Sequence, residues 1–328
     1  MIRRTLYVVP ETPKEVREEF RREAARRGVR FLFESGEYFL AEENAPDLAW
    51  ATDIAWEAYE VDAASITAAA KNLKQTAHDL GKKSTRWLRL EGLHHRRAAL
   101  VAENLATGEA PSLSYRRGAN RPDSLRPSEG KPALAGFFLL SPERALAVFD
   151  SLTPYPGGSA PFAEEKHGPP SRAYLKLWEI CARLERAGLG IPKPGETALD
   201  LGSCPGGWTW ALAELGARVA SFDGAPLDPA VAKRPEVAYE KADAFRLVPR
   251  AADWFFSDMI CEPKRLPELL ARWRDAGCAR FAVSVKFKGE ADEAALARLR
   301  EIPGARLRHL RQNKHELTWF LAPDLKRI

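Results

Sequence analysis

A turn with three glycines is the first feature of this sequence that could do chemistry. It reads Asp200-Leu-Gly-Ser-Cys-Pro-Gly-Gly-Trp208 and joins a β-rich run to a helical stretch. Glycines let the backbone come close to a ligand, and the next β-rich run ends in Asp223, whose carboxylate can accept both hydroxyls of an adenosine ribose. The turn and the acid together predict a cofactor that contains a nucleoside.

The glycine spacing decides between two such cofactors. A dinucleotide fingerprint needs glycine at its first, third and sixth positions, and here Cys204 takes the third, which disfavours close approach of a pyrophosphate. S-adenosylmethionine contains adenosine without phosphates, so it suits this turn better than NAD does. A third acid, Asp243, closes the following β-rich run, where it could bind the adenine amino group.

These residues lie in a regular alternation of β-rich and helical segments over residues 171–328. Strands that alternate with helices predict a mostly parallel sheet with both faces covered, and ligands in such sheets bind beyond the carboxyl ends of the strands. The expected fold class is therefore α/β, with a Rossmann-like domain and a seven-stranded sheet. After a helix at about 171–187, the expected strands are 198–202, 218–223, 237–241, 254–258, 280–287, 305–311 and 316–322.

A smaller α+β region is expected before this domain. Eight of the twenty residues 151–170 are proline or glycine, which predicts a linker. Residues 1–62 are expected to form a small module, and residues 63–150 a second domain. The expected elements are strands at 5–9, 85–90 and 136–140, helices at about 13–27, 63–80 and 95–105, and a hairpin at 29–40.

Composition excludes several classes of protein. The 328 residues are 45% hydrophobic and 29% charged, which is ordinary for globular domains and unlike disordered or fibrous chains. No apolar run approaches the roughly 18 residues of a membrane helix, so we expect a cytoplasmic protein without a membrane partner. The four cysteines form no Cys-x-x-Cys pair and have no histidine cluster beside them, so we expect neither disulfides nor a metal site.

Basic charge is concentrated after residue 62. Residues 1–62 carry 9 basic and 14 acidic side chains, whereas residues 63–160 carry 14 and 8. Trp87 and Tyr115 lie among the basic residues, as aromatic residues do on many RNA-binding surfaces, although a solvated helix face would have the same composition. The basic stretches contain Lys82, Lys83, Arg86, Arg89, His94, His95, Arg96 and Arg97, and further on Arg116, Arg117, Arg121 and Arg126.

The motifs of residues 169–322 resemble those of FtsJ-like RNA ribose 2′-O-methyltransferases. DLGSCPGGW is similar to the first motif of that family, and PSRAYLKL (170–177), SDM (257–259), VKF (285–287) and HELT (315–318) fall where it has its others. Before residue 150 only the layout agrees, with a small module followed by a THUMP-like domain. The resemblance implies a class I methyltransferase fold, S-adenosylmethionine as cofactor, and large-subunit (23S) ribosomal RNA or its precursor as substrate.

The resemblance also implies a catalytic tetrad of Lys176, Asp258, Lys286 and Glu316. Methyl transfer to a ribose hydroxyl is an in-line displacement, so the enzyme must position the 2′-oxygen and remove its proton. A lysine can act as the base if a neighbouring cation and partial burial lower its pKa from ~10.4 to ~7–8. Lys286, at the end of the fifth β-rich run, is the expected base, and Lys176 would supply the neighbouring charge. Asp258 and Glu316 would hold the amines and orient the sugar.

A cofactor-binding set around the glycine turn follows from the same resemblance. Its expected members are Ser171, Gly202, Ser203, Cys204, Pro205, Gly206, Gly207, Trp208, Asp223, Asp243 and Asp258. Close to the tetrad, Arg306, Arg308, Arg311 and Lys314 could line the RNA path.

Methylation of an exocyclic amine is disfavoured because Ser-Asp-Met-Ile stands where such enzymes have an Asn/Asp-Pro-Pro-aromatic run. Methylation of a pyrimidine C5 is disfavoured because Cys261 does not follow a proline.

We therefore expect an RNA ribose 2′-O-methyltransferase whose N-terminal half binds structured RNA. A nicotinamide oxidoreductase on a similar sheet is the alternative enzyme, which Cys204 disfavours. A non-catalytic RNA-binding or ribosome-assembly factor is the alternative from another class, and it would bind the cofactor without turnover. The complete set of two lysines and two acids favours the enzyme. The sequence predicts neither the modified nucleotide nor the oligomeric state.

Overall fold

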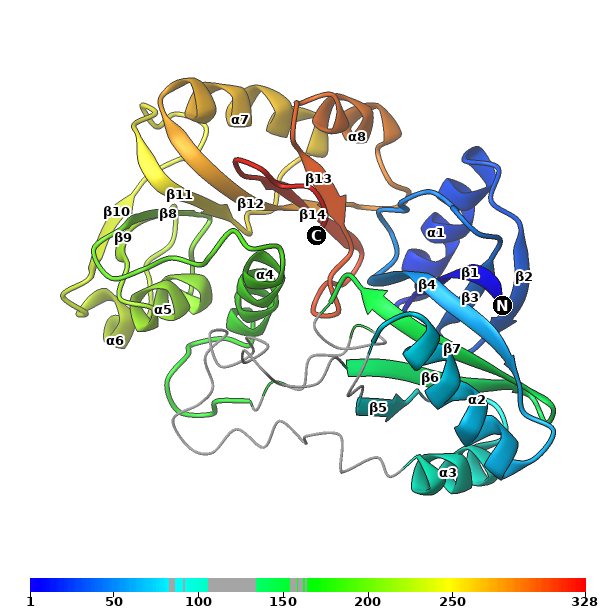
Figure 1. The fold of residues 1–328 in the computed structure, drawn as a ribbon. Coiled ribbons are helices and arrows are strands. Elements are labelled where there is room, and N and C mark those ends of the chain that lie inside the picture. Colours follow the sequence, from blue (N-terminus) through cyan, green and yellow to red (C-terminus); the bar gives the residue numbers. More distant parts are fainter. Residues whose placement is uncertain (83–85, 91, 106–133, 154–157, 159–161, 163) are drawn as a thin grey trace. The chain divides into compact units, whose positions relative to one another are not determined.

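The computed structural model describes residues 1–328 except 83–85, 91, 106–133, 154–157, 159–161 and 163. The chain divides into two compact units, of which the second contains Phe162–Ile328 (Figure 1). Each unit has its own seven-stranded sheet, so the fold is mixed α/β. Among the described residues, no helix is long and apolar enough to cross a membrane.

The sheet of the first unit is antiparallel apart from one parallel pair, β5 with β6. The strand order is β2-β3-β1-β4-β7-β6-β5. Its strands are β1 (Ile2–Val8), β2 (Phe31–Ser35), β3 (Tyr38–Ala41), β4 (Asp53–Asp62), β5 (Arg86–Arg89), β6 (Leu134–Ser141) and β7 (Arg144–Ser151). Its helices are α1 (Lys14–Arg26), α2 (Ile66–Asp79) and α3 (His95–Asn104).

One sheet takes strands from both expected N-terminal modules. The ten-residue strand β4 lies between β1 and β7 and pairs with both, so a continuous ladder crosses the expected boundary at residue 62. The strands β4 and β7 themselves were not expected. Strand β7 extends to Ser151, the first residue of the expected linker, and much of that linker lies outside the described residues.

The second unit has the strand order β10-β9-β8-β11-β12-β14-β13. Strands β10, β9, β8, β11 and β12 run parallel, whereas β14 is antiparallel to both β12 and β13. All seven strands lie at the expected positions, so the predicted mostly parallel sheet is confirmed. They are β8 (Thr197–Leu201), β9 (Arg218–Asp223), β10 (Val237–Lys241), β11 (Ala252–Ser257), β12 (Cys278–Lys286), β13 (Arg306–Arg308) and β14 (Glu316–Leu321).

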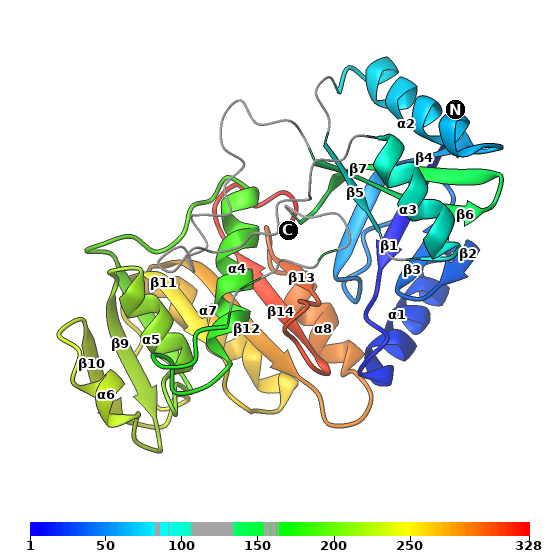
Figure 2. The same cartoon turned by 90° about the horizontal axis from the view of Figure 1, so that it is seen from below.

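Helices cover both faces of this second sheet. Helices α4 and α5 lie on one face, and α7 and α8 lie on the other, as the two views in Figure 1 and Figure 2 show. Apolar residues of α4 and α5, such as Trp178 and Leu212, are buried against the strands and form the core of the unit. The helices are α4 (Tyr174–Arg186), α5 (Gly207–Glu214), α6 (Pro229–Ala232), α7 (Leu266–Asp275) and α8 (Glu293–Arg300), with a short 3-10 helix, η2 (Pro263–Arg265).

Candidate active site

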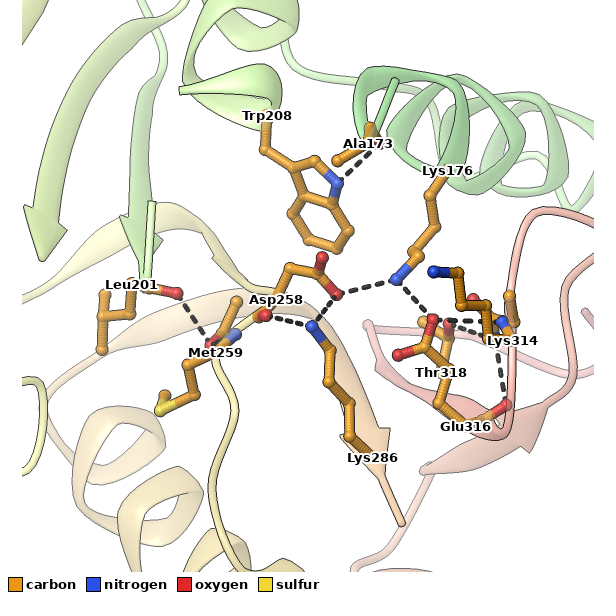
Figure 3. A network of polar contacts seen from close by, with 12 residues as sticks. Ala173, Lys176, Leu201, Trp208, Asp258, Met259, Lys286, Lys314, Glu316 and Thr318 are labelled. Atoms are coloured by element: carbon orange, nitrogen blue, oxygen red, sulfur yellow. Dashed lines mark hydrogen bonds and ion pairs between the residues drawn. The ribbon is translucent and has the colours of Figure 1, made fainter. Parts of the chain in front are cut away.

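The four residues of the expected tetrad converge at the carboxyl end of the parallel strands. Lys176 lies on α4, Asp258 follows β11, Lys286 ends β12 and Glu316 begins β14. The Nζ atom of Lys176 donates to Asp258 Oδ1 at 2.8 Å and to Glu316 Oε1 at 2.6 Å (Figure 3). The side chains of Lys176 and Glu316 are each only 8% exposed, so this ion pair is largely shielded from water.

Lys286 approaches the same carboxylate from the sheet. Its Nζ atom donates to the main-chain oxygen of Asp258 at 2.6 Å and lies 3.2 Å from Asp258 Oδ1. Lys286 and Glu316 also face each other in the antiparallel β12–β14 pair. The register of these two strands therefore fixes the second lysine beside the second acid, and Asp258 lies between the two amines (Figure 3).

The charge states of Lys176 and Asp258 follow from these contacts. Burial disfavours the ammonium of Lys176, but the carboxylates of Asp258 and Glu316 outweigh burial and raise the pKa of Lys176. Burial likewise acts against the ionised form of Asp258, but Lys176 and Lys286 outweigh it and lower the pKa of Asp258. Lys176 is therefore a permanent cation at neutral pH, and Asp258 is a permanent anion.

A cavity of about 690 Å³ opens onto the tetrad from the side of β14. Lys176, Asp258, Lys286 and Glu316 all line it. The remaining lining comes from the residues before α4, from the segment that follows Asp258, from the residue after β12, and from the segment between β13 and β14. These other lining residues are Arg172, Ala173, Ile260, Phe287, Gln312, Lys314 and His315.

The glycine turn after β8 has a backbone shape that other residues would not tolerate. Gly202 has φ +75°, and a Cβ atom there would lie 2.7 Å from the Cα atom of Met259. Gly206 has φ +112° and precedes the first turn of α5. A side chain at either position would strain the turn or push the segment after β11 away from it.

Asp223, at the end of β9, holds this turn in place. Its Oδ2 atom accepts the main-chain N–H of Cys204 at 3.0 Å, and its Oδ1 atom accepts that of Ala225 at 2.8 Å. Each carboxylate oxygen has a further lone pair, so Asp223 can still accept hydroxyl hydrogens from a ligand.

A second cavity, of about 680 Å³, lies between the glycine turn and Asp243. Five of the expected cofactor-binding residues line it: Gly202, Cys204, Asp223, Asp243 and Asp258. Met259, Ile260, Phe245 and Lys286 contribute further side chains, and the first three of these were not expected. Asp258, Ile260 and Lys286 line both this cavity and the one at the tetrad, so the two cavities meet at the tetrad.

The other six expected cofactor-binding residues lie around the turn rather than in the lining of this cavity. They are Ser171, Ser203, Pro205, Gly206, Gly207 and Trp208. The indole of Trp208 donates to Ala173 O at 2.9 Å, and its ring faces Lys176, whose Nζ lies 6.0 Å from the ring centroid (Figure 3). The hydroxyl oxygens of Ser171 and Ser203 are buried and have no hydrogen-bond partner within the described parts of the chain.

Asp200 is a buried acid that the sequence did not single out as a site residue. It is fully buried beneath the turn, and its Oδ2 atom accepts the hydroxyl of Thr209 at 2.7 Å. Burial, together with the nearby charges of Asp258 and Asp223, raises the pKa of Asp200 to about 7.

The structure corrects part of the expected RNA path. Lys314 does line the tetrad cavity, but Arg308 is 1% exposed and donates to Ile328 O at 2.8 Å, so it is a core residue. Arg306 donates to the main-chain oxygen of Lys326. Of the basic residues expected to contact RNA before residue 150, Lys83 and those between 106 and 133 lie outside the described residues. In the described parts of the chain, no group of three histidine, cysteine or acidic residues could hold a metal ion.

Comparison with known proteins identifies the class to which the second unit is related. Residues 169–278 match the family model of FtsJ-like methyltransferases, which confirms the resemblance inferred from the motifs.

Curated relatives bear the name ribosomal RNA large subunit methyltransferase M. The relative from Halorhodospira halophila is 44% identical over 119 residues, which cover 35% of this chain and 34% of the relative. The relative from Methylococcus capsulatus is 35% identical over 202 residues, which cover 58% of this chain and 57% of the relative. The chain thus matches between a third and somewhat more than half of the length of these relatives.

Proposed function

We propose that this protein is an S-adenosylmethionine-dependent RNA ribose 2′-O-methyltransferase that acts on large-subunit (23S) ribosomal RNA or its precursor. The observation that carries this proposal is the meeting of two cavities at Asp258 and Lys286. One cavity would hold the cofactor and the other the acceptor nucleotide. The two reactants would then meet beside two amines and two carboxylates, which is the arrangement that an in-line transfer requires.

The residues of the second cavity fit the parts of S-adenosylmethionine. Asp223 has lone pairs free for the two ribose hydroxyls, and Asp243 lines the same cavity, where the adenine would bind. Ser171 and Ser203, whose hydroxyls are buried, lie around the turn and outside the lining of this cavity, so the fit rests on the two acids. When bound, the cofactor supplies an electrophilic methyl group.

The tetrad cavity fits a nucleotide of an RNA chain. Arg172 and Lys314 line it, and cations of this kind bind phosphates of a nucleic-acid backbone. Glu316 and Asp258 can accept hydrogen bonds from sugar hydroxyls. The 2′-oxygen of a ribose in this cavity would approach the methyl group directly, beside Asp258 and Lys286.

Lys286 is the proposed general base. Its Nζ atom would take the proton of the 2′-hydroxyl while the oxygen forms its bond to the methyl carbon and the bond from that carbon to sulfur breaks. The main-chain oxygen of Asp258, 2.6 Å away, would orient the amine for this task. The pKa of Lys176 is raised, so Lys176 stays protonated and serves as the neighbouring cation rather than as the base.

The first unit would bind the same RNA. His94, His95 and Arg96 are exposed at the start of α3, which supports an RNA contact there. Other basic side chains nearby have internal partners, as when Lys82 pairs with Glu57 at 2.8 Å and Arg97 donates to Ala63 O at 2.7 Å. A THUMP-like character for residues 63–150 and a cytoplasmic location belong to this proposal as well.

The proposal is tested by mapping ribose methylation across all RNA from cells with and without the gene. We expect one 2′-O-methylated nucleotide of the large-subunit RNA to lose its methyl group in the absence of the gene, and to regain it when the gene is restored. A methylation map that does not change would contradict the proposal and favour the non-catalytic assembly factor. A change on a base rather than on a ribose would contradict the assigned chemistry.

A further inference from the structure

The segment between β13 and β14 supplies much of one wall of the tetrad cavity. Residues 311–316, which we call the β13–β14 segment, contribute Gln312, Lys314, His315 and Glu316 to that wall. Glu316 is itself a member of the tetrad. The shape of the cavity therefore depends on what holds this short segment in one conformation.

Glu179 of α4 contacts the start of this segment. Its Oε1 atom accepts the main-chain N–H of Arg311 at 2.8 Å, and its Oε2 atom accepts that of Gln312 at 2.9 Å. The residue is 4% exposed. A buried carboxylate that receives two successive main-chain N–H groups fixes the direction of the backbone at that point.

A salt bridge neutralises the carboxylate that makes these contacts. Arg183, one turn further along α4, donates from Nε and Nη2 to Glu179 Oε1 at 3.2 and 2.9 Å. The arginine side chain is 1% exposed, and that of Glu179 is 5% exposed. Loss of the carboxylate would therefore remove an acceptor that one buried cation and two main-chain donors share, which is costly.

Two further contacts, made by Lys176 and His309, hold the rest of the β13–β14 segment. Lys176, three residues before Glu179 on α4, donates to Glu316 Oε1 at 2.6 Å. His309 is fully buried, and burial lowers its pKa to about 3, so its ring is neutral. Its Nε2 atom lies 3.0 Å from Lys314 O, and because a carbonyl oxygen can only accept, this nitrogen carries the hydrogen.

We propose that Glu179 is a positioning residue, which anchors the β13–β14 segment so that Lys314, His315 and Glu316 meet the acceptor nucleotide. One helix would thus hold both ends of the segment, with Glu179 at its start and Lys176 at its end. The role in acceptor binding rests on the proposed function, whereas the anchoring contact does not. In the described chain, none of the lining of the cofactor cavity comes from this segment. The anchor therefore acts on the acceptor and not on the cofactor.

The test compares Glu179→Gln with Glu185→Gln in the full-length protein. Glutamine keeps the size of Glu179 but presents an amide NH₂ where an oxygen accepted a hydrogen bond, so at least one contact becomes donor against donor. Glu185 lies on the same helix, takes no part in the contacts described above and is not among the lining residues of either cavity. Three quantities are measured for both variants and the parent: amide hydrogen exchange resolved to single residues, the dissociation constant of S-adenosylmethionine, and KM and kcat for the RNA.

We expect the N–H groups of Arg311 and Gln312 to exchange at least about tenfold faster in Glu179→Gln, which corresponds to a loss of about 1.4 kcal/mol of protection. We also expect KM for the RNA to rise or kcat to fall by a similar factor, with cofactor affinity unchanged and Glu185→Gln like the parent. Unchanged exchange at both N–H groups would overturn the anchor. Faster exchange with unchanged KM and kcat would overturn its role in acceptor binding. Equal losses of cofactor and RNA affinity would show a merely structural role and would also overturn the proposal.

If the parent protein transfers no methyl group, the proposed function fails, and the RNA-positioning part of this proposal fails with it. The exchange measurement still decides whether Glu179 anchors the segment. Should Glu179→Gln not fold, Glu179→Asp provides the second variant. Its carboxylate is one methylene shorter, so it keeps the charge for Arg183 while it withdraws from the two main-chain donors, and the same results are expected.

Discussion

Lys176 Nζ and Glu316 Oε1 lie 2.6 Å apart although the two residues are 140 positions apart in the sequence. The contact joins α4, which precedes the sheet in the chain, to β14, which is inserted between β12 and β13. Asp258 receives a hydrogen bond from the same amine, so one buried cation serves two acids. The charges of the site are therefore balanced only when α4, β11, β12 and β14 have come together.

Removal of this cation is predicted to destabilise the fold. Lys176→Met keeps the length of the side chain but leaves Asp258 and Glu316 close together without Lys176, and loss of one partner from a buried ion pair costs about 3–5 kcal/mol. Urea unfolding should show this loss. The exposed Lys193 provides the control, since Lys193→Met should unfold like the parent. The double variant Lys176→Met/Glu316→Gln should recover part of the loss, and a single variant as stable as the parent would contradict the assigned charges.

Asp200 is predicted to make stability fall as pH rises toward neutrality. Its pKa is raised from an ordinary 3.8 to about 7, so between these values the folded state binds a proton that the unfolded state has lost. The stabilising contribution is complete below about pH 4 and is lost as pH passes 7. Asp200→Asn cannot ionise, and it retains an oxygen to accept the Thr209 hydroxyl.

We therefore expect Asp200→Asn to be more stable than the parent at pH 8, by an amount on the order of a few kcal/mol, and similar to it at pH 4. Denaturant unfolding at a series of pH values measures this difference. The exposed Asp275 gives the matched control, because Asp275→Asn should follow the parent at every pH. A difference between Asp200→Asn and the parent that does not depend on pH would show that Asp200 is already ionised in the folded protein.

Asp223 is predicted to contribute to cofactor affinity. Hydrogen bonds to a charged group contribute about 1.5–3 kcal/mol, so Asp223→Ala should weaken binding of S-adenosylmethionine by roughly 10- to 100-fold. Calorimetric titration with S-adenosylhomocysteine, which has the same adenosine, measures the change without turnover. Glu240→Ala, at an exposed position on the neighbouring strand β10, should bind like the parent. Unaltered affinity of the Asp223 variant would refute its assignment to the ribose hydroxyls.

The sequence predicted the second unit well because its signals are local. Strands such as β11 and β12 are apolar runs between turn residues, and the chemistry-bearing residues follow the strand ends, where the topology gathers ligands. Asp223 and Asp243 were found in this way, and the family motifs added Lys176, Asp258, Lys286 and Glu316. Trp208 is expected beside the cofactor, which stays a prediction; its indole contacts Ala173 and faces Lys176.

Features that depend on long-range pairing could not be predicted. In β4 the apolar and charged residues do not alternate strictly, and β7 begins only three residues after the end of β6 and runs into the proline-rich stretch. That β4 and β7 join two expected modules in one sheet is a property of the ladder and not of either segment. Glu179 is a comparable case. In the sequence it is one more charged position on an amphipathic helix, and its role emerges only when Arg311 and Gln312 lie beside it.

The central claim is that Lys286 removes the proton of a ribose hydroxyl during methyl transfer. The most direct test incubates the parent, Lys286→Ala and the exposed control Lys288→Ala with methyl-labelled S-adenosylmethionine and large-subunit RNA from cells that lack the gene. The RNA is then digested to nucleosides. We predict label in a 2′-O-methylnucleoside for the parent and the control, and at least about a 100-fold lower rate for Lys286→Ala with nearly unchanged cofactor affinity. Turnover retained by Lys286→Ala, or label attached to a base, would contradict the account.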